Sequence, residues 1–398
     1  MGAKQKPRRV LIIVENLPSP FDRRVWQEAT TLQQHGYVVS IICPTGKGYE
    51  KKFEKIDGIH IYRHNLPLEA EGAWGYLLEY SVALFWQFIL AWRVLFSRGF
   101  DVIHACNPPD NIFLVAGCFK VFGKKFLFDH HDINPELYEA KFGRRDFFYK
   151  IMLLWERWTF KLADVSIATN DSYKKIAIER GKMSPDNVIV VRSGPKLDRM
   201  KRLPVVKALK CKRKFLVGYV GVMGAQEGID YLLRSVRYIV KDMAREDVHF
   251  GLVGGGTSID ELMAYAVELG IADYVTFTGR IPDRQMLEML NTADVCVNPD
   301  VANEMNDKST MNKIMEYMAL AKPIVQFDLT EGRISAQDAS LYAERNNEVD
   351  FARKIIFLLD HPEERLRMGK FGNTRVKNEL AWDYEAPKLL MAYDQVFR

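Results

Sequence analysis

The chain has 398 residues, of which 48% are hydrophobic and 27% charged, and this length is enough for two globular domains with separate cores. Its five cysteines lie far apart and form no Cys-x-x-Cys pair, so zinc or dithiol redox work is not indicated and a reducing cytoplasm is the simplest compartment. The polar start of the chain is followed by only five apolar residues, 10–14, which is too short for a signal peptide.

The net charge of +5 is unevenly distributed. Up to Lys214 there are 36 basic and 22 acidic residues, a balance of +14, whereas the remainder has 20 basic and 29 acidic residues, a balance of −9. A basic first half suits nucleic acid, anionic lipid or a phosphorylated acceptor. Because no nucleic-acid-binding signature occurs, we expect lipid or pyrophosphate and no nucleic acid.

A first α/β domain is predicted over residues 1–195. Residues 10–14, 28–35 and 37–42 follow a strand, helix and strand pattern, which is typical of a βαβ unit. Further short apolar runs are separated by helical patterns, as in a parallel sheet with helices on both faces. These runs are residues 102–105, 126–128, 165–168 and 188–191.

Residues 75–96 form an apolar stretch that approaches the length of a membrane span. Glu79, Gln87 and Arg93 interrupt it, so no integral span is predicted. Two interpretations stay open: a buried helix packed on the sheet, or a helix partly docked in a membrane interface.

A second α/β domain is predicted over residues 215–378, after a basic linker at 196–214. Its predicted strands are residues 215–220, 248–253, 274–277, 295–297 and 323–327, with helices such as 231–241 and 259–269 between them. The last segment, 379–398, is predicted to be an amphipathic helix that crosses back to the first domain. The fold class is therefore α/β, with two doubly wound, Rossmann-like domains that face each other across a cleft.

Two glycine clusters follow predicted strands of the second domain. Gly218, Gly221 and Gly224 have the spacing G-x-x-G-x-x-G, which differs from the dinucleotide fingerprint G-x-G-x-x-G. A second run begins with Gly254 and Gly255. Such loops place backbone N–H groups near a ligand phosphate, or they serve only as tight turns that need positive φ.

Several segments, in order along nearly the whole chain, resemble a known family. Residues 306–323, NDKSTMNKIMEYMALAKP, contain Glu316 followed by YMALAKPIV, similar to the second glutamate and the following run of an E-x7-E signature. His131 and Asp132 in FDHHDINPE resemble the same family's HD segment, and residues 193–194 and 278–281 resemble its other loops. The family is glycosyltransferase family 4, a group of retaining enzymes with the GT-B fold that includes sucrose and glycogen-type synthases and many bacterial capsule and O-antigen transferases.

The resemblance implies a role for each site residue. Glu316 would accept the ribose hydroxyls of a nucleotide sugar, and His131 would contact the donor sugar, while Lys308 joins them as the third catalytic candidate. The diphosphate would be held by N–H groups of the glycine loops and of a helix start near residues 309–312. The complete donor set is Gly221, Gly224, Gly254, Gly255, Arg280, Ile281, Ser309, Thr310, Asn312, Lys313 and Glu316, and the acceptor-side set is Asp132, Arg23 and Arg24.

No metal and no other cofactor is expected. The chain has no Asp-x-Asp triplet, so leaving-group charge would be met by N–H dipoles and basic side chains. An alternative metal site would combine His130 and His131 with Asp129 or Asp132. It is disfavoured because adjacent residues at a strand end point to opposite faces of the sheet.

Three positions depart from the family pattern. The first glutamate of E-x7-E falls at Lys308, and the family's phosphate-binding Arg and Lys fall at Val222 and Glu227. We infer a relocated charge clamp in which Lys308 neutralises the diphosphate, with Lys313 one turn further along if the helix is continuous. The alternative is that Lys308 is an ordinary surface lysine.

The expected activity is transfer of a sugar, with retention, from a nucleotide diphosphate sugar, preferably a UDP-sugar, to a lipid-linked saccharide acceptor in surface polysaccharide synthesis. The protein would act at the inner face of the cell membrane, against an anionic lipid surface. Two alternatives are a nucleotide-sugar 2-epimerase of the same architecture and a non-catalytic sugar-nucleotide-binding subunit.

Overall fold

The computed structural model describes residues 6–66 and 72–398. The first five residues of the polar N-terminus lie outside the described part, as does the side chain of Glu79. The chain divides into two compact units. The first contains Met1–Ser193 and Glu385–Arg398, and the second contains Gly194–Tyr384.

The first unit is built on one eight-stranded sheet, in which every neighbouring pair is parallel except β3 and β4. From edge to edge the strands are β3 (Phe53–Ile56), β4 (Ile59–His64), β2 (Val38–Pro44), β1 (Arg9–Ile13), β5 (Val102–Cys106), β6 (Lys125–His130), β7 (Val165–Ala168) and β8 (Val188–Val190). The order reverses between β1 and β5, and open α/β sheets bind ligands at such a switch point.

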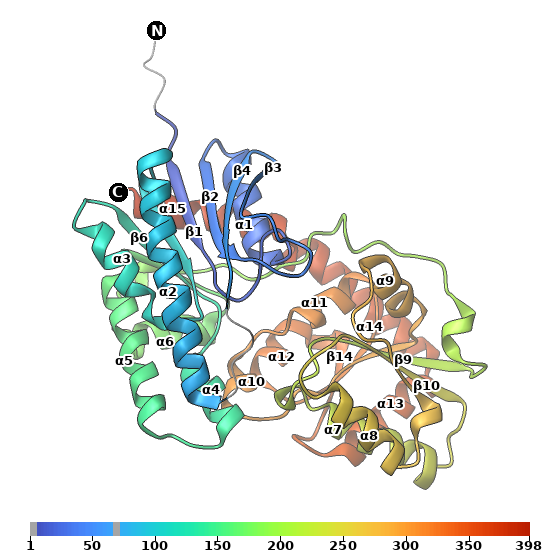
Figure 1. Ribbon diagram of the computed structural model, residues 1–398. Helices are drawn as coiled ribbons and strands as arrows, with labels where there is room; N and C mark the ends of the chain where they lie inside the picture. Colours follow the sequence, from blue (N-terminus) through green and yellow to red (C-terminus); the bar gives the residue numbers. More distant parts are fainter. Residues whose placement is uncertain (1–5, 67–71) are drawn as a thin grey trace. The chain divides into compact units, whose positions relative to one another are not determined.

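Helices cover both faces of this sheet (Figure 1). One face carries α2 (Gly72–Ser97), α3 (Phe113–Lys120), α5 (Phe147–Leu162) and α6 (Asp171–Glu179); the other carries α1 (Arg23–Gln34) and the end of α15 (Trp382–Val396). A shorter helix, α4 (Asn134–Phe142), follows β6 and packs against α5.

Side-chain caps fix where α1, α5 and α6 of this unit begin. The helix predicted over residues 28–35 begins earlier, at Arg23, because the Asp22 carboxylate accepts from the backbone N–H of Val25 at 3.1 Å. This earlier start places Arg24 in the first turn of α1, at the carboxyl edge of the sheet. Asp146 and Asn170 cap α5 and α6 in the same way.

The sequence pattern missed three strands. β3 and β4 form a hairpin at the sheet edge, where β3 alternates exposed and half-buried residues over only four positions, Phe53–Ile56. In the second unit β14 (Ser340–Ala343) is equally short and half-buried in its middle. Edge strands of four residues, such as β3 and β14, carry too little apolar periodicity to be recognised. β4 is longer and buried throughout, but its sequence IHIYRH mixes apolar residues with histidine and arginine.

Helix α2 corresponds to the apolar stretch at residues 75–96. Ala83, Gln87, Ala91 and Val94 recur at helical spacing and are buried, so this side packs on the sheet. The opposite side remains exposed at Phe85, Trp86, Ile89 and Phe96. Among the described residues, no helix combines the length and the apolar character that crossing a membrane requires.

The second unit is built on a six-stranded, all-parallel sheet. Its order is β11 (Val275–Phe277), β10 (Val248–Val253), β9 (Phe215–Val220), β12 (Val295–Asn298), β13 (Ile324–Phe327) and β14. The helices are α7 (Ile229–Arg237), α8 (Ile259–Glu268), α9 (Asp283–Thr292), α10 (Glu304–Lys308), α11 (Asn312–Ala319), α12 (Thr330–Ala336), α13 (Glu348–Asp360) and α14 (Pro362–Arg375).

Two apolar cores lie on the two faces of this second sheet. One joins the sheet to α7, α8 and α13, and the other joins it to α9, α11 and the turn Val376–Leu380. Residues 196–214, predicted to be a linker, pack on this unit: Met200 is buried in the second core, and Lys210 pairs with Asp294 at 2.7 Å. The segment Glu385–Arg398 belongs to the first unit, where the Tyr393 hydroxyl bonds to His104.

Candidate functional site

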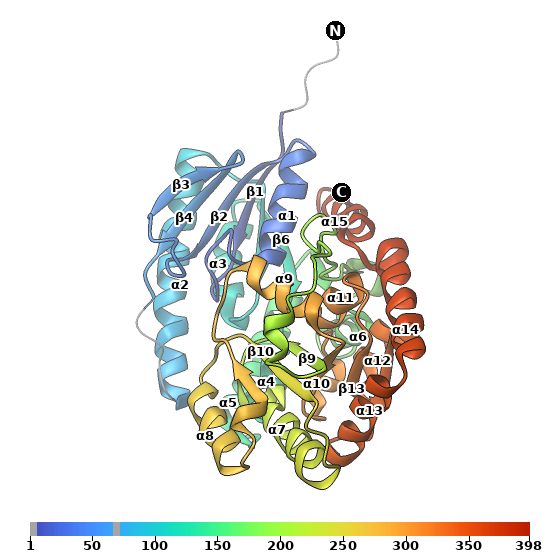
Figure 2. The same cartoon turned by 90° about the vertical axis from the view of Figure 1, so that its right-hand side faces the viewer.

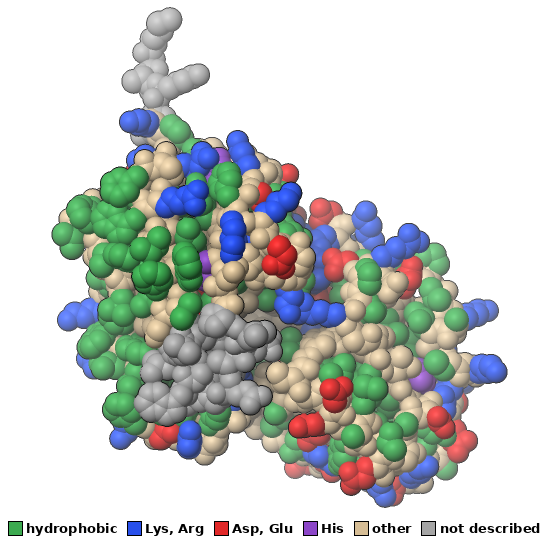
Figure 3. All heavy atoms as spheres, in the orientation of Figure 1, with side chains coloured by type: hydrophobic (Ala, Val, Ile, Leu, Met, Phe, Trp, Pro, Cys, Tyr) green, Lys and Arg blue, Asp and Glu red, His purple; other side chains and the backbone are tan. Residues whose placement is uncertain are grey.

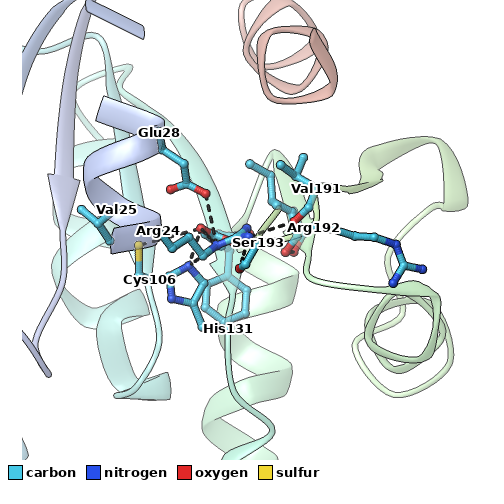
Figure 4. A network of polar contacts seen from close by, with 12 residues as sticks. Arg24, Val25, Glu28, Cys106, His131, Val191, Arg192 and Ser193 are labelled. Atoms are coloured by element: carbon cyan, nitrogen blue, oxygen red, sulfur yellow. Dashed lines mark hydrogen bonds and ion pairs between the residues drawn. The ribbon is translucent and has the colours of Figure 1, made fainter. Parts of the chain in front are cut away.

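A polar cluster lies at the carboxyl edge of the first sheet, and Arg24 is at its centre (Figure 4). The guanidinium donates through Nη2 to Asp129 Oδ1 at 2.9 Å, and through Nη1 to the Val191 carbonyl at 2.9 Å and Ser193 Oγ at 3.0 Å. Strands β6 and β8 and helix α1 are thus connected through one buried side chain. Arg24 therefore holds these elements together, and its burial prevents the guanidinium group from rotating freely.

His131 lies against Asp129 in the same cluster. Its Nε2 is 2.5 Å from Asp129 Oδ2 and 2.8 Å from Nε of Arg24. Burial alone would raise the pKa of Asp129, but the charges of Arg24 and His131 hold it well below its usual range, so this carboxylate only accepts. Because a carboxylate can only accept, Nε2 of His131 donates in this contact.

His104 and Tyr393 also hold Asp129 in place. His104 Nε2 donates to Asp129 Oδ2 at 3.3 Å, while its Nδ1 accepts from the Tyr393 hydroxyl at 2.8 Å. Burial lowers the pKa of His104, which keeps its ring neutral. Asp129 thus accepts from two imidazoles and one guanidinium, and this fixes the orientation of the His131 ring.

Glu28 is fully buried beside the same charges. Its Oε1 lies 3.2 Å from Arg24 Nε, one turn along α1. Burial and then the negative charge of Asp129 raise the pKa of Glu28 well above its usual range, against the opposing charge of Arg24. Arg24 is therefore the positive group that both carboxyl groups of the cluster contact.

Four side chains here could hold a metal ion: ligand atoms of Glu28, Cys106, Asp129 and His131 all lie within 4.8 Å of one another. Arg24 already supplies a fixed positive charge to both carboxyl groups. Burial also raises the pKa of Cys106 well above its usual range, which opposes the thiolate that metal binding needs. These features fit a guanidinium-centred site better than a cation site.

The backbone at His131 is held by the preceding loop. Asn107, just after β5, accepts through Oδ1 from the N–H groups of His131 at 2.6 Å and Asp132 at 3.1 Å. Its Nδ2 donates to Asp110 Oδ1 and to the Asp132 carbonyl. Asp132 therefore takes part through its backbone, and burial raises the pKa of its side chain.

The residues grouped around His131 by sequence are separated in the structure. His130 is fully buried, with Nε2 3.5 Å from Glu156 Oε1 and its ring against Phe160. It does not join the cluster of four possible ligands, as the alternation of side chains along β6 predicts. Of the two arginines predicted on the acceptor side, Arg24 enters the cluster, whereas Arg23 is exposed.

In the second unit, the two glycine loops meet each other at the carboxyl edge of the sheet. The N–H of Gly221 donates to the Val253 carbonyl at 3.1 Å, and a Cβ on Gly254 would lie 1.8 Å from the Gly221 carbonyl oxygen. Gly254 also has φ +136°. Gly221 and Gly224 have no positive φ; a Cβ on Gly221 would lie 2.3 Å from the Tyr219 hydroxyl, so the Tyr219 side chain, and not a turn, requires glycine there.

The predicted base loop joins the same edge. The N–H of Gly254 donates to the Gly279 carbonyl at 3.1 Å, which brings residues 278–281 beside the glycines. Ile281 packs on the core, and Arg280 is exposed. Gly255 has open space where a Cβ would be.

Lys313 occupies a buried ion-pair cluster rather than an open clamp. Its Nζ lies 2.7 Å from Glu227 Oε2 and 3.0 Å from Asp300 Oδ1, and 5.0 Å from the centroid of the Tyr219 ring. Burial alone would lower the pKa of Lys313, but Asp300 and Glu227 raise it well above its usual range. Glu227, at a basic position of the family pattern, is thus the partner of a lysine supplied by α11.

Lys308 and Lys313 do not share one continuous helix, so the condition for placing them one turn apart is not met. α10 ends at Lys308, the backbone is extended at Ser309 and Met311, and α11 begins at Asn312. Lys308 instead pairs with Glu304 at 2.6 Å, within the last turn of α10. The break arises because Ser309 turns back through Oγ to the Met305 carbonyl and so ends the first helix.

The remaining predicted donor residues lie around the start of α11. Glu316 is half-buried one turn into α11, and Asn312 at its first position is exposed. Thr310 Oγ1 lies 3.5 Å from Glu331 Oε2 in the connecting loop. Tyr317 connects this helix to the sheet, because its hydroxyl accepts from Val220 N–H at 2.9 Å and donates to the Val297 carbonyl at 3.2 Å.

Sequence reasoning missed several residues of both clusters. Glu28 and His104 in the first unit, and Tyr219 and Asp300 in the second, have no motif of their own. The one available signal was Glu28 four residues after Arg24, a spacing at which opposite charges meet on a helix, but the predicted helix began only at Glu28. His104, Tyr219 and Asp300 join their clusters only because strands far apart in the sequence pair in the sheets.

Two consecutive segments of the chain match known protein families. Residues 22–199 match the family model described as Glycosyltransferase Family 4, and residues 214–361 match the one described as Glycosyl transferases group 1. The first segment lies almost entirely in the first unit and the second lies within the second unit.

Curated relatives are similar at low identity. The 2-deoxystreptamine glucosyltransferase of Streptomyces kanamyceticus is 24% identical over 256 residues, 61% of this chain and 63% of that protein. The D-inositol 3-phosphate glycosyltransferase of Thermomonospora curvata is 27% identical over 262 residues, 61% of this chain and 59% of that protein. The similarity therefore spans about three fifths of the length of these relatives.

Solved structures match over nearly the whole chain. Sucrose-phosphate synthase from Thermosynechococcus elongatus has a TM-score of 0.78 at 17% identity, covering 98% of this chain and 99% of that one. HepE of Anabaena, solved with UDP and glucose, has a TM-score of 0.73 at 13% identity, covering 97% and 99%. The fold is thus α/β with two parallel-sheet domains, the GT-B type, as the sequence predicts.

Proposed function

Because the chain joins a Glycosyltransferase Family 4 segment to a Glycosyl transferases group 1 segment, we propose that it is a retaining glycosyltransferase. It moves a sugar from a nucleotide diphosphate sugar to a lipid-linked saccharide acceptor at a membrane, in surface polysaccharide synthesis. A UDP-sugar is the preferred donor, supported by the UDP complex of HepE. The protein acts as a peripheral protein of the inner membrane face.

The observation that carries this proposal is the gathering of loops at one edge of the second sheet. The loops after β9, β10 and β11 meet through Gly221, Gly254 and Gly279. Tyr317 ties the start of α11 to β9 and β12. An edge rich in backbone N–H groups, next to a helix start with a half-buried carboxylate, suits a nucleoside diphosphate.

Each group at this edge has a proposed role toward the donor. Glu316 accepts both ribose hydroxyls, Arg280 and Ile281 lie beside the base, and the N–H groups of the glycine loops and of α11 bind the diphosphate. Lys313 forms ion pairs with two carboxyl groups, so its positive charge is largely compensated within the protein. Lys308 remains the proposed cation for the diphosphate. On donor binding its ammonium group would leave Glu304 and pair with the diphosphate.

The proposed chemistry is a front-face displacement with an oxocarbenium-like transition state. The bond from the anomeric carbon to the β-phosphate oxygen breaks, and a bond from that carbon to the acceptor oxygen forms on the same face. The acceptor proton passes to the departing phosphate oxygen. His131, fixed by Asp129, exchanges hydrogen bonds with a hydroxyl of the transferred sugar, and Arg24 and the Asp132 backbone hold this side of the site.

Metal independence is part of this proposal. The groups nearest to a possible cation site are organised by Arg24, and the leaving diphosphate is stabilised by N–H dipoles and a lysine. Activity in the presence of a chelator, compared with activity after addition of Mg²⁺ or Mn²⁺, tests this point directly.

A thermal-shift panel of nucleotides and nucleotide sugars tests the donor proposal. A ligand at 100 times its dissociation constant adds about 2.7 kcal/mol to the stability of the state that binds it. We expect UDP and a UDP-sugar to raise the unfolding midpoint, and NAD to leave it unchanged. An equal response to all nucleotides, or none, contradicts the proposal.

Incubation of the donor alone and with acceptor separates the other activities. Transfer to a lipid-linked saccharide with retained anomeric configuration supports the proposal. Conversion of the donor to its 2-epimer without acceptor indicates an epimerase. Donor binding without transfer or slow hydrolysis indicates a non-catalytic subunit.

A further inference from the structure

An apolar surface covers one side of the first unit, over helices α2, α3 and α5 and the turn after α3. In Figure 3 hydrophobic side chains gather over this region. The strongest exposure is at Val121, with 84%, Phe96, with 80%, and Phe147, with 70%. The other exposed members are Phe85, Trp86, Ile89, Leu114, Phe122, Leu154 and Trp158. Eight exposed apolar side chains on three helices, with Val121 and Phe122 in the turn after α3, exceed the scattered pattern of an ordinary protein surface.

Aromatic contacts make this surface continuous across the helices. Trp92 of α2 packs against Phe122 with ring centroids 5.5 Å apart, and it stacks on Phe96 at 5.4 Å. Phe113 of α3 packs against Trp158 of α5 at 5.3 Å. The exposed rings are therefore supported by buried or half-buried rings beneath them, and the surface is a rigid face rather than a set of loose side chains.

Where the structure describes the side chains of these helices, the exposed charges are all basic. Exposed basic side chains occur at Arg93 of α2 and at Lys150, Arg157 and Lys161 of α5. In the described residues 81–97, 113–125 and 147–162, the one acidic side chain is Glu156. It is fully buried and is paired with Arg180 at 2.7 Å. An apolar aromatic face with basic side chains and no exposed acid is complementary to the interface of an anionic lipid bilayer.

We propose that this α2–α3–α5 surface docks the protein on an anionic bilayer. The aromatic side chains enter the boundary between headgroups and acyl chains, and Arg93, Lys150, Arg157 and Lys161 contact lipid phosphates. This proposal rests on the proposed function, because it identifies the face by which the protein would reach a membrane-bound acceptor. A second copy of the chain is a poor occupant, since a twofold pairing of the same face would bring its basic side chains together.

Vesicle sedimentation tests the surface with the whole chain and without any sugar acceptor. Wild type is mixed with vesicles of equal phosphatidylglycerol and phosphatidylcholine, and with pure phosphatidylcholine, at low and high salt. We expect strong binding to the anionic vesicles at low salt, and weaker binding in the other conditions. The apolar variant Phe96→Ser/Val121→Ser should bind at least about tenfold more weakly, because each side chain loses its transfer into the interface.

A matched control uses two exposed apolar side chains outside this surface. Val267→Ser/Leu366→Ser in the second unit removes a similar apolar area, 67% and 75% exposed, and should leave vesicle binding unchanged. The charge variant Lys150→Glu/Arg157→Glu should lower binding to anionic vesicles and reduce its salt dependence. Equal loss in the apolar and control pairs, or unchanged binding in the apolar pair, overturns the proposal.

Two further measurements separate this inference from the function itself. Donor affinity by calorimetry should be the same in wild type and in all these variants. If wild type binds a UDP-sugar but no vesicles, the surface assignment fails and the donor assignment stands. If Phe96→Ser/Val121→Ser dissociates a dimer seen by sedimentation velocity, the face belongs to a second copy and the lipid proposal is wrong.

Discussion

Lys313 and Glu227 are an ion pair, 2.7 Å apart, that joins the start of α11 to the glycine loop after β9. The family pattern places a basic residue at position 227, where this chain has Glu227. The positive charge comes instead from Lys313 of α11, 86 residues later in the sequence. Asp300 adds a second carboxyl group at 3.0 Å. Charge at this edge is therefore balanced within the protein, and the phosphates of the proposed donor would be bound mainly by other groups.

Removing Lys313 should destabilise the protein, since Glu227 and Asp300 would face each other without a cation. Lys313→Met is expected to cost about 3–5 kcal/mol, the usual penalty for breaking a buried pair on one side. The urea midpoint measures this cost. Lys313→Met/Glu227→Gln should recover part of it, because fewer unpaired charges remain. A double variant no more stable than the single one contradicts the pairing.

Glu316→Ala should weaken donor binding by about 1.5–3 kcal/mol, the typical value of a charge-assisted hydrogen bond. The fold should survive, because Glu316 is only half-buried. Calorimetry with a UDP-sugar measures the change, and Glu261→Ala on the exposed side of α8 serves as the control. Unchanged donor affinity would remove Glu316 from the site.

Lys308→Glu restores the first glutamate of the family signature but should lower turnover more than Lys308→Ala does. The reason is that Lys308→Glu adds a negative charge where a diphosphate is proposed to bind, and it also faces Glu304. Steady-state kinetics of both variants decide the matter. If Lys308→Glu keeps full turnover and Lys308→Ala is neutral, Lys308 is a surface lysine.

Stability should fall as pH rises from about 4 to about 7, partly because of Asp300. Burial and Glu227 raise the pKa of Asp300 from 3.8 to about 7, against the opposing effect of Lys313. In this window the folded state holds a proton that the unfolded state has released, so the free energy of unfolding decreases with pH, by at most about 1.4 kcal/mol per pH unit for one group.

Urea midpoints between pH 4 and 8 measure this dependence in wild type and in Asp300→Asn. The variant should have a shallower slope, because the neutral amide binds no proton. Some slope should persist, since burial and Glu156 also raise the pKa of Asp110 to about 7. The same slope in both proteins would show that Asp300 does not hold the proton.

The architecture could be predicted because long apolar runs alternate with helical patterns along both units. The position of His131 after β6 followed from the same pattern. What could not be predicted depends on contacts between distant residues: Lys313 with Glu227, or His104 with Tyr393 at the end of the chain. The helix start near residues 309–312 was expected, but the short helix α10 (Glu304–Lys308) before it was not, because five residues carry too little periodicity to be recognised.

The last fourteen residues have a consequence for the order in which the molecule can be completed. Glu385–Arg398 belong to the first unit, where Tyr393 is buried and bonds to His104, which in turn holds Asp129. On the ribosome, most of the first unit emerges before the second unit, yet this part of it is synthesised after the second unit. The second unit can therefore finish its core while the first still lacks the helix that supports its polar cluster, so the unit that is begun first is completed only after the other.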